Sequence, residues 1–256
     1  MIARPLAHQA WPDVPTRPMV LVPVGSCEQH GPHLPLVTDT TIAVALAEGL
    51  SDRLAAPDRP VVVAPPLAYT ASGEHQAFAG TISIGIEALR LTLVELVRSL
   101  RTWCGRVVFV NAHGGNARAL GNAVAQLRWE GHPVAWVAAE AGSATDTHAG
   151  YTETALMLHL APELVDMTRA EAGSSVPITE LMPALTTGGV AAVAPSGILG
   201  DPTAATARDG EAIMLRMVDR AAALVVSGQP DDAGRLRPAA AAAGAGAAPA
   251  APGTAP

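Results

Sequence analysis

The feature that most restricts the fold of this chain is a repeated alternation of short valine-rich segments with longer amphipathic ones. Short apolar runs rich in β-branched residues predict strands that are buried on both faces. Spacings of three and four between apolar residues predict helices. The expected strands are residues 20–24, 61–64, 106–111 and 134–139, and the expected helices are residues 41–54, 87–103, 116–130, 152–160 and 209–226.

Strands that alternate with helices require crossover connections, which produce a mostly parallel sheet. We therefore predict an α/β fold with helices on both faces of the sheet. The chain has 256 residues, of which 49% are hydrophobic, so one domain can bury a full core. We expect that domain to span residues 1–228. Residues 229–256 are rich in alanine, glycine and proline and predict a disordered tail; a docking segment is the alternative.

The charge distribution argues against several kinds of partner. The net charge is −7, and no cluster of basic residues contradicts it, so we expect neither nucleic acid nor an anionic membrane surface as a partner. No apolar run reaches transmembrane length, and the first residues lack the pattern of a signal peptide. The two cysteines cannot form a disulfide framework. These features predict a cytoplasmic protein.

The scarce ionisable residues concentrate first in residues 25–40, GSCEQHGPHLPLVTDT. In an extended segment Glu28 and His30 point to the same side and can reach one site. Asp39 follows at the start of an expected helix, where a helix cap is the alternative explanation. Imidazole together with carboxylate suits zinc, manganese and iron. We expect His33 to have a supporting or structural role.

A second candidate segment, residues 111–116 (NAHGGN), follows an expected strand. Its position at the carboxyl end of a strand makes His113 a candidate ligand, although a lone histidine is commonly structural. Gly114 and Gly115 allow the backbone to approach a ligand closely. The segment lacks the sequence fingerprint of a phosphate-binding loop.

The third candidate segment is residues 146–154, DTHAGYTET. Glu153 lies in the first turn of an expected helix, where a carboxylate also suits the helix dipole. His148 lies in the glycine-containing loop before it and is free to approach a substrate. In another such loop, Glu74 and His75 are candidates for lining the entrance to the site; an ordinary surface loop is the alternative.

These segments, together with residues 200–203 (GDPT), resemble the creatininase (creatinine amidohydrolase) family over about residues 18–226. The resemblance implies a three-layer α/β/α sandwich, two divalent metal ions (iron, zinc or manganese) and a homo-oligomer such as a hexamer. It assigns one metal to Glu28, Asp39 and His113 and the other to His30, Asp39 and Glu153. Residues 72–89 and 188–193 resemble a peptidase branch, which implies a short modified peptide as substrate and release of a C-terminal Val-Tyr dipeptide.

One departure from the family pattern concerns the substrate. Creatinine-hydrolysing members have a glutamate where this chain has Gly115, so Glu153 must supply that carboxylate. The missing side chain counts against creatinine and predicts a wider pocket. We expect metal-dependent amide hydrolysis in which His148 donates a proton to the leaving nitrogen or stabilises the tetrahedral intermediate.

Three other functions remain open from the sequence. The first is hydrolysis of a cyclic amide or formamide by the same chemistry. The second is a non-catalytic, metal-stabilised binding protein, which a closed and fully ligated site would favour. The third is nucleotide binding through Gly114 and Gly115, which the missing phosphate fingerprint disfavours.

Overall fold

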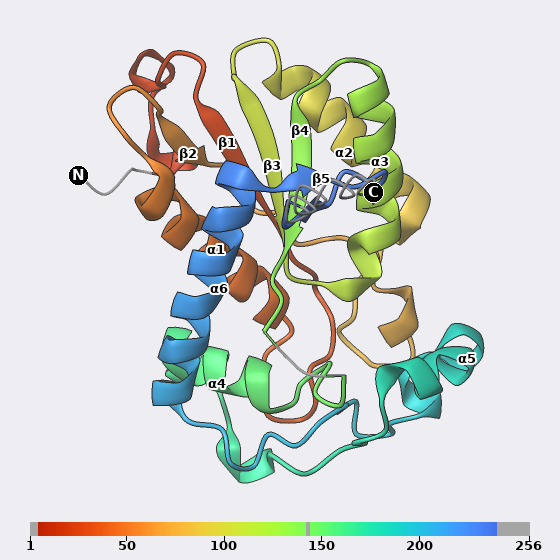
Figure 1. Ribbon diagram of the computed structural model, residues 1–256. Coiled ribbons are helices and arrows are strands. Elements are labelled where there is room, and N and C mark those ends of the chain that lie inside the picture. Colours follow the sequence, from red (N-terminus) through yellow and green to blue (C-terminus); the bar gives the residue numbers. More distant parts are fainter. Residues whose placement is uncertain (1–4, 142–143, 240–256) are drawn as a thin grey trace, which may run out of the picture.

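The computed structural model describes residues 5–141 and 144–239 and has a parallel sheet at its centre (Figure 1). The strands are β1 (Met19–Val24), β2 (Val61–Val63), β3 (Arg106–Asn111) and β4 (Val134–Ala138), in the spatial order β2-β1-β3-β4. Every neighbouring pair in this sheet is parallel. The predicted parallel sheet is therefore confirmed.

Helices cover both faces of the sheet, as Figure 1 shows. Alternate residues of β3 enter different cores: Val108 and Val110 face one, while Val107 and Phe109 face the other. The first core contains α1 (Thr38–Leu54), α4 (Tyr151–Leu160) and α6 (Ala207–Ser227). The second contains α2 (Gly85–Leu100) and α3 (Ala117–Trp129). This arrangement is the three-layer α/β/α sandwich.

A sixth helix, α5 (Ile178–Gly188), was not among the expected elements. It has Pro183 in its interior, a residue that normally argues against a helix because it removes a hydrogen bond and crowds the preceding turn. Its apolar side chains are only partly buried, in a small satellite core around Val190 and Leu199. The remaining helical segments are single 3-10 turns at Leu6–His8, Trp11–Asp13, Gly73–His75, Gly114–Asn116, Pro162–Leu164, Met167–Arg169 and Val190–Ala192.

The predicted disordered tail is wrong for its first eleven residues. Strands β5 (Gln229–Pro230) and β6 (Leu236–Arg237) form an antiparallel hairpin, and Leu236 is buried in the first core. The amide of Trp136 in β4 donates to the carbonyl of Gly234 at 3.1 Å. Since β4 is an edge strand with free backbone groups, the hairpin gives that edge a partner. Residues 240–256 lie outside the described part of the chain.

The parallel strands place three loops at the same edge of the sheet. Residues 25–37 follow β1, residues 112–116 follow β3, and the segment before α4 follows β4. Ligand sites of open α/β sheets lie at the carboxyl ends of strands. Within the described residues, no helix is both long and apolar enough to cross a bilayer.

Candidate metal centre

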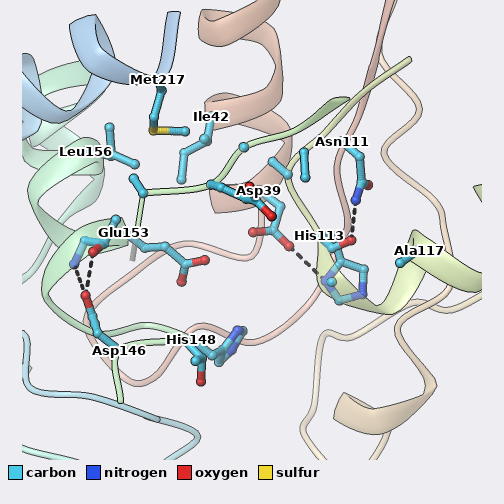
Figure 2. Close-up of a pocket in the computed structure, with 18 of the residues that line it drawn as sticks. Asp39, Ile42, Asn111, His113, Ala117, Asp146, His148, Glu153, Leu156 and Met217 are labelled. Carbon is cyan, nitrogen blue, oxygen red and sulfur yellow. Dashed lines mark hydrogen bonds and ion pairs between the residues drawn. The ribbon is translucent and has the colours of Figure 1, made fainter. Parts of the chain in front are cut away.

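Five predicted ligands converge at the carboxyl ends of the strands. They come from the loop after β1, the first turn of α1, the loop after β3 and the first turn of α4. Figure 2 shows three of them, Asp39, His113 and Glu153. Their potential ligand atoms lie within 4.8 Å of one another in two groups that share one residue. The groups are Glu28–Asp39–His113 and His30–Asp39–Glu153, the same two sets that the family resemblance implies.

Imidazole nitrogens face carboxylate oxygens throughout this cluster. His113 Nδ1 lies 3.1 Å from Glu28 Oε1 and 3.3 Å from Asp39 Oδ2. His30 Nε2 lies 3.2 Å from Asp39 Oδ1 and 3.6 Å from Glu153 Oε2. Asp39 therefore directs one carboxylate oxygen toward each group.

Glu28 provides the test of whether these residues fit a cation. Its side chain is fully buried, and neither carboxylate oxygen accepts a hydrogen bond of good geometry among the described residues; Oε1 meets only histidine nitrogens, at 3.1 to 3.8 Å, and Oε2 is left open. Buried carboxylates are normally hydrogen-bonded or paired, because an uncompensated charge inside a protein is strongly destabilising. A divalent cation held with Asp39 and His113 would compensate this charge, so the residues fit a metal ion.

Mutual charge and burial shift the pKa values of the cluster. Burial alone lowers the pKa of His30, but the charges of Asp39 and Glu153 raise it to about 10. Burial raises the pKa of the Glu153 carboxyl to about 7, and the Asp39 charge adds to this rise. Burial opposes ionisation of Asp39 as well, yet the neighbouring histidines hold its pKa well below the usual range. The cluster without a cation therefore retains protons that a cation must displace.

Asp39 does not act as a helix cap. The N-cap of α1 is Val37, and Asp39 lies inside the first helical turn. Its Oδ2 accepts a hydrogen bond of 2.8 Å from the hydroxyl of Ser26, a contact that no pattern in the sequence indicated. Because Ser26 is itself buried, this contact orients the carboxylate toward the two histidines.

Two asparagines hold the loop that carries His113. Asn111 donates to the carbonyl oxygen of His113 at 2.7 Å. Asn116 is fully buried, donates to the carbonyl of Gly25 at 2.9 Å and accepts from the amide of Ala71 at 3.1 Å. This loop is thus bonded to the loop after β1. In the sequence, the asparagines on either side of the Ala-His-Gly-Gly segment could have indicated that hydrogen bonds hold this loop.

The space beside Gly115 is filled from another part of the chain. A Cβ atom at Gly115 would lie 2.2 Å from Glu74 Oε1 and 2.4 Å from His113 Nε2. Glu74 Oε1 lies 3.4 Å from His113 Nε2. The expectation that the missing side chain widens the pocket is wrong, because the carboxylate of Glu74 occupies that place.

His75 does not line an entrance but lies inside the cluster. It is 3% exposed, and its Nε2 is 3.3 Å from Glu28 Oε1. Its ring centroid is 4.3 Å from that of His148, which lies 4.2 Å from that of His30. Residue spacing gave no indication that these three tilted rings lie together, because the loop with His75 is far from both other histidines in the sequence.

His148 is placed both for chemistry and for ligation. Its Nε2 lies 2.8 Å from the backbone oxygen of Gln29 and 3.0 Å from the side-chain nitrogen of the same residue. Its Nδ1 faces Glu28 Oε1 at 3.8 Å, and Glu28, His30 and His148 make a third potential ligand group. Burial, followed by the charges of His30 and His75, holds the pKa of His148 well below its usual value.

His33 belongs to none of the three potential ligand groups. Its Nε2 lies 2.9 Å from the hydroxyl oxygen of Thr154 in α4. Burial lowers the pKa of His33 to about 4, and the nearby His30 contributes to the decrease. A neutral His33 therefore links the loop after β1 to α4.

A cavity of about 550 Å³ opens onto the cluster, as Figure 2 shows. Of the residues predicted to bind substrate, Gly114 lines it, whereas Glu74 and Gly115 line a separate cavity. The lining of the main cavity includes Asp39, Ile42, His113, Glu140, His148, Glu153, Leu156, Met217, Arg220 and Arg235. The buried cluster is thus reachable by a small molecule or a peptide end.

Comparisons with known proteins identify the family of this chain. Residues 7–225 match the Creatininase family, described as creatinine amidohydrolase. A mycofactocin precursor peptide peptidase from Mycolicibacterium smegmatis is 55% identical over 220 residues, covering 86% of this chain and 89% of the relative. The protein of the same name from Mycobacterium ulcerans is 52% identical over 226 residues, covering 86% of this chain and 90% of the relative.

Solved structures share the fold. A putative creatinine amidohydrolase from Bacteroides fragilis superposes with a TM-score of 0.71 at 25% identity, covering 87% of this chain and 94% of that one. A manganese form of creatininase has a TM-score of 0.68 at 23% identity, with 86% and 96% coverage. The family match over most of the chain and the close relatives lead to one conclusion: this protein belongs to the creatininase family of metal-dependent amidohydrolases.

Proposed function

We propose that the protein is a dinuclear metallopeptidase that releases a C-terminal Val-Tyr dipeptide from a modified mycofactocin precursor peptide. The observation that carries this proposal is the 55% identity, over 86% of the chain, to a mycofactocin precursor peptide peptidase. Supporting it is a cavity that opens onto two potential ligand groups sharing Asp39.

Two divalent ions (iron, zinc or manganese) would be held by Glu28–Asp39–His113 and by His30–Asp39–Glu153. When bound, such ions polarise an amide carbonyl and lower the pKa of a water molecule for attack. The chain supplies the orientation of these ligands. Ser26 directs Asp39, and the amide of Ala149 donates to Glu153 Oε2 at 2.6 Å.

We assign proton transfer to His148. An amide leaves as an amine and needs a proton as the bond to carbon breaks. His148 lines the cavity, and burial holds its pKa well below the usual value. A low pKa keeps the imidazole of His148 neutral near pH 7, so in this proposal His148 first accepts a proton from the attacking water and then passes that proton to the leaving nitrogen. Gly114, in the same cavity wall, leaves backbone accessible to a peptide.

A second candidate is hydrolysis of a cyclic amide or formamide. The position of Glu74 favours it, because this carboxylate fills the space beside His113 that a side chain at position 115 would otherwise occupy. A non-catalytic binding protein is disfavoured by family membership and by the open cavity over the cluster.

Incubation of the metal-loaded protein with the modified precursor peptide, followed by mass spectrometry, tests the choice. We expect free Val-Tyr, a peptide shortened by two residues, and negligible turnover of creatinine. Rapid opening of creatinine beside an intact peptide would promote the second candidate. Light scattering would test the homo-oligomer, and fractionation of cells the cytoplasmic location; both remain predictions.

A further inference from the structure

The cavity over the metal cluster also contains a basic group. Arg220 of α6 and Arg235 of the β5–β6 hairpin both line it, and no other basic residue does so within the described part of the chain, histidines aside. The side chain of Arg235 is 20% exposed and that of Arg220 is 59% exposed. The arginines come from two elements that meet only in the tertiary structure.

A single carboxylate is shared between the two arginines. Glu140 Oε2 lies 2.9 Å from Arg220 Nη2, and Glu140 Oε1 pairs with Arg235. The guanidinium of Arg235 also lies over the ring of Trp136, 5.1 Å from its centroid. Two cations facing one anion leave a net positive charge, and each guanidinium has five N–H donors, so donors remain for a second carboxylate.

The rest of the cavity defines what such a ligand would look like. Ile42, Leu156 and Met217 contribute apolar surface to the cavity that also contains Asp39 and Glu153 (Figure 2). A complementary ligand has an amide that reaches the metal cluster, an apolar body and an anionic group for the arginines. The last residues of a peptide with a free C-terminus combine these three properties.

We propose that Arg220 and Arg235 bind the C-terminal carboxylate of the peptide substrate and thereby set the position of the cleaved bond. This inference rests on the proposed peptidase function. Arginine recognises carboxylates with two parallel hydrogen bonds, which fixes both distance and orientation. An extended residue spans at most about 3.6 Å, so an anchored C-terminus permits only a narrow choice of bonds to reach the cluster.

The test compares the dipeptide Val-Tyr with Val-Tyr-amide, in which the carboxylate is replaced by a neutral group. Binding of each to the metal-loaded protein is measured by calorimetry. We expect the free acid to bind about tenfold more tightly, since a hydrogen bond to a charged group contributes at least this much. Arg220→Gln and Arg235→Gln should each lower the affinity for Val-Tyr to about that for Val-Tyr-amide. Neither variant should change the affinity for Val-Tyr-amide.

Three further variants sharpen the test. Arg216→Gln changes an exposed arginine of α6 that does not line the cavity and should have no effect on either dipeptide. Arg220→Lys keeps the positive charge but lacks the planar guanidinium with its paired N–H donors. It should therefore reduce the affinity for Val-Tyr less than Arg220→Gln does. Glu140→Gln removes the competing carboxylate and should strengthen binding of the acid. Melting temperatures identify any variant that fails to fold, and Arg220, on the exposed side of a helix, is the safer of the two positions.

Equal binding of acid and amide, or binding of neither, would overturn the inference. Parallel turnover of the precursor peptide separates this result from failure of the proposed function. Cleavage of the precursor peptide together with equal binding of acid and amide would support the peptidase function and contradict carboxylate binding by the arginines. The protein could instead prefer the acid, lose that preference in Arg220→Gln, and cleave no peptide. That result would support carboxylate binding by the arginines and contradict the proposed peptidase function.

Discussion

At the scale of single residues, Asp39 connects the two potential ligand groups. Its Oδ1 lies 3.2 Å from His30 and its Oδ2 lies 3.3 Å from His113. We expect the wild-type protein to bind close to two divalent ions per chain and Asp39→Ala to lose most of both. Elemental analysis of dialysed protein measures this, with Asp201→Ala, an exposed carboxylate, as the control. Full occupancy in Asp39→Ala would remove the bridging arrangement.

A variant of His148 can distinguish a role in catalysis from a role in metal binding. We expect His148→Ala to keep its metal content and melting temperature but to lose on the order of 10²–10⁴ in kcat, the usual contribution of a positioned acid or base. Its Nδ1 is 3.8 Å from Glu28 Oε1, so the alternative is a metal ligand. Metal content that falls together with activity would identify it as one. His132→Ala, in a half-buried histidine outside the cavity, is the matched control.

The adjacent glycines of the His113 loop offer a paired experiment. A Cβ at Gly115 would come within 2.4 Å of both Glu74 and His113, whereas a Cβ at Gly114 would meet nothing within 4 Å. We therefore expect Gly115→Ala to displace His113 and weaken metal binding at least tenfold, while Gly114→Ala keeps wild-type metal affinity and melting temperature. Zinc titration measures the difference. Equal affinities would show that Glu74 moves away without disturbing His113.

At the scale of elements, the β5–β6 hairpin belongs to the folded protein. Leu236 is 2% exposed, and full burial of a leucine contributes about 2 kcal/mol. Ending the chain at Gln229 should lower the melting temperature by roughly 4–8 °C, because about 1 kcal/mol corresponds to 2–4 °C at this size. Ending it at Ala239 is the control and should leave the temperature unchanged. An unchanged temperature in both would show that the hairpin contributes no stability.

The elements that the sequence predicted and those it missed differ in where their contacts lie. The strands and the five expected helices carry regular apolar patterns, such as Leu89, Leu93 and Val97 in α2, all of which are buried. Helix α5 contains Pro183 and buries no residue fully. The hairpin has strands of two residues each, too short for any periodicity, and is held by the edge of β4.

At the scale of the whole molecule, metal binding should depend steeply on pH. Without a cation, the pKa of His30 is about 10 and that of Glu153 about 7, so at pH 6 both groups hold a proton. A cation binds the deprotonated forms and must displace these protons. Its affinity should therefore rise as the pH passes 7, where Glu153 loses its proton, and continue to rise toward pH 10, where His30 does. Calorimetry in buffers of different ionisation enthalpy should detect proton release at pH 7. Affinity independent of pH between 6 and 8 would contradict this charge arrangement.

The local sequence determined the layered α/β architecture and pointed to most of the candidate ligands. Periodicity identified strands and helices because it reports which face of each element is buried. The positions of Glu28, His113 and Glu153 at element ends were readable for the same reason, since parallel strands bring their carboxyl ends to one edge. The pairing of ligands into groups came from the family resemblance.

Only the tertiary structure decided what surrounds those ligands. It placed Glu74 in the space beside Gly115, brought His75 against Glu28, and gathered Arg220 and Arg235 around Glu140 at the cavity. These contacts join segments far apart in the chain, and no local pattern encodes them. They form because packing of the layers sets which loops meet, and because buried charges are tolerated only where an opposite charge lies close by.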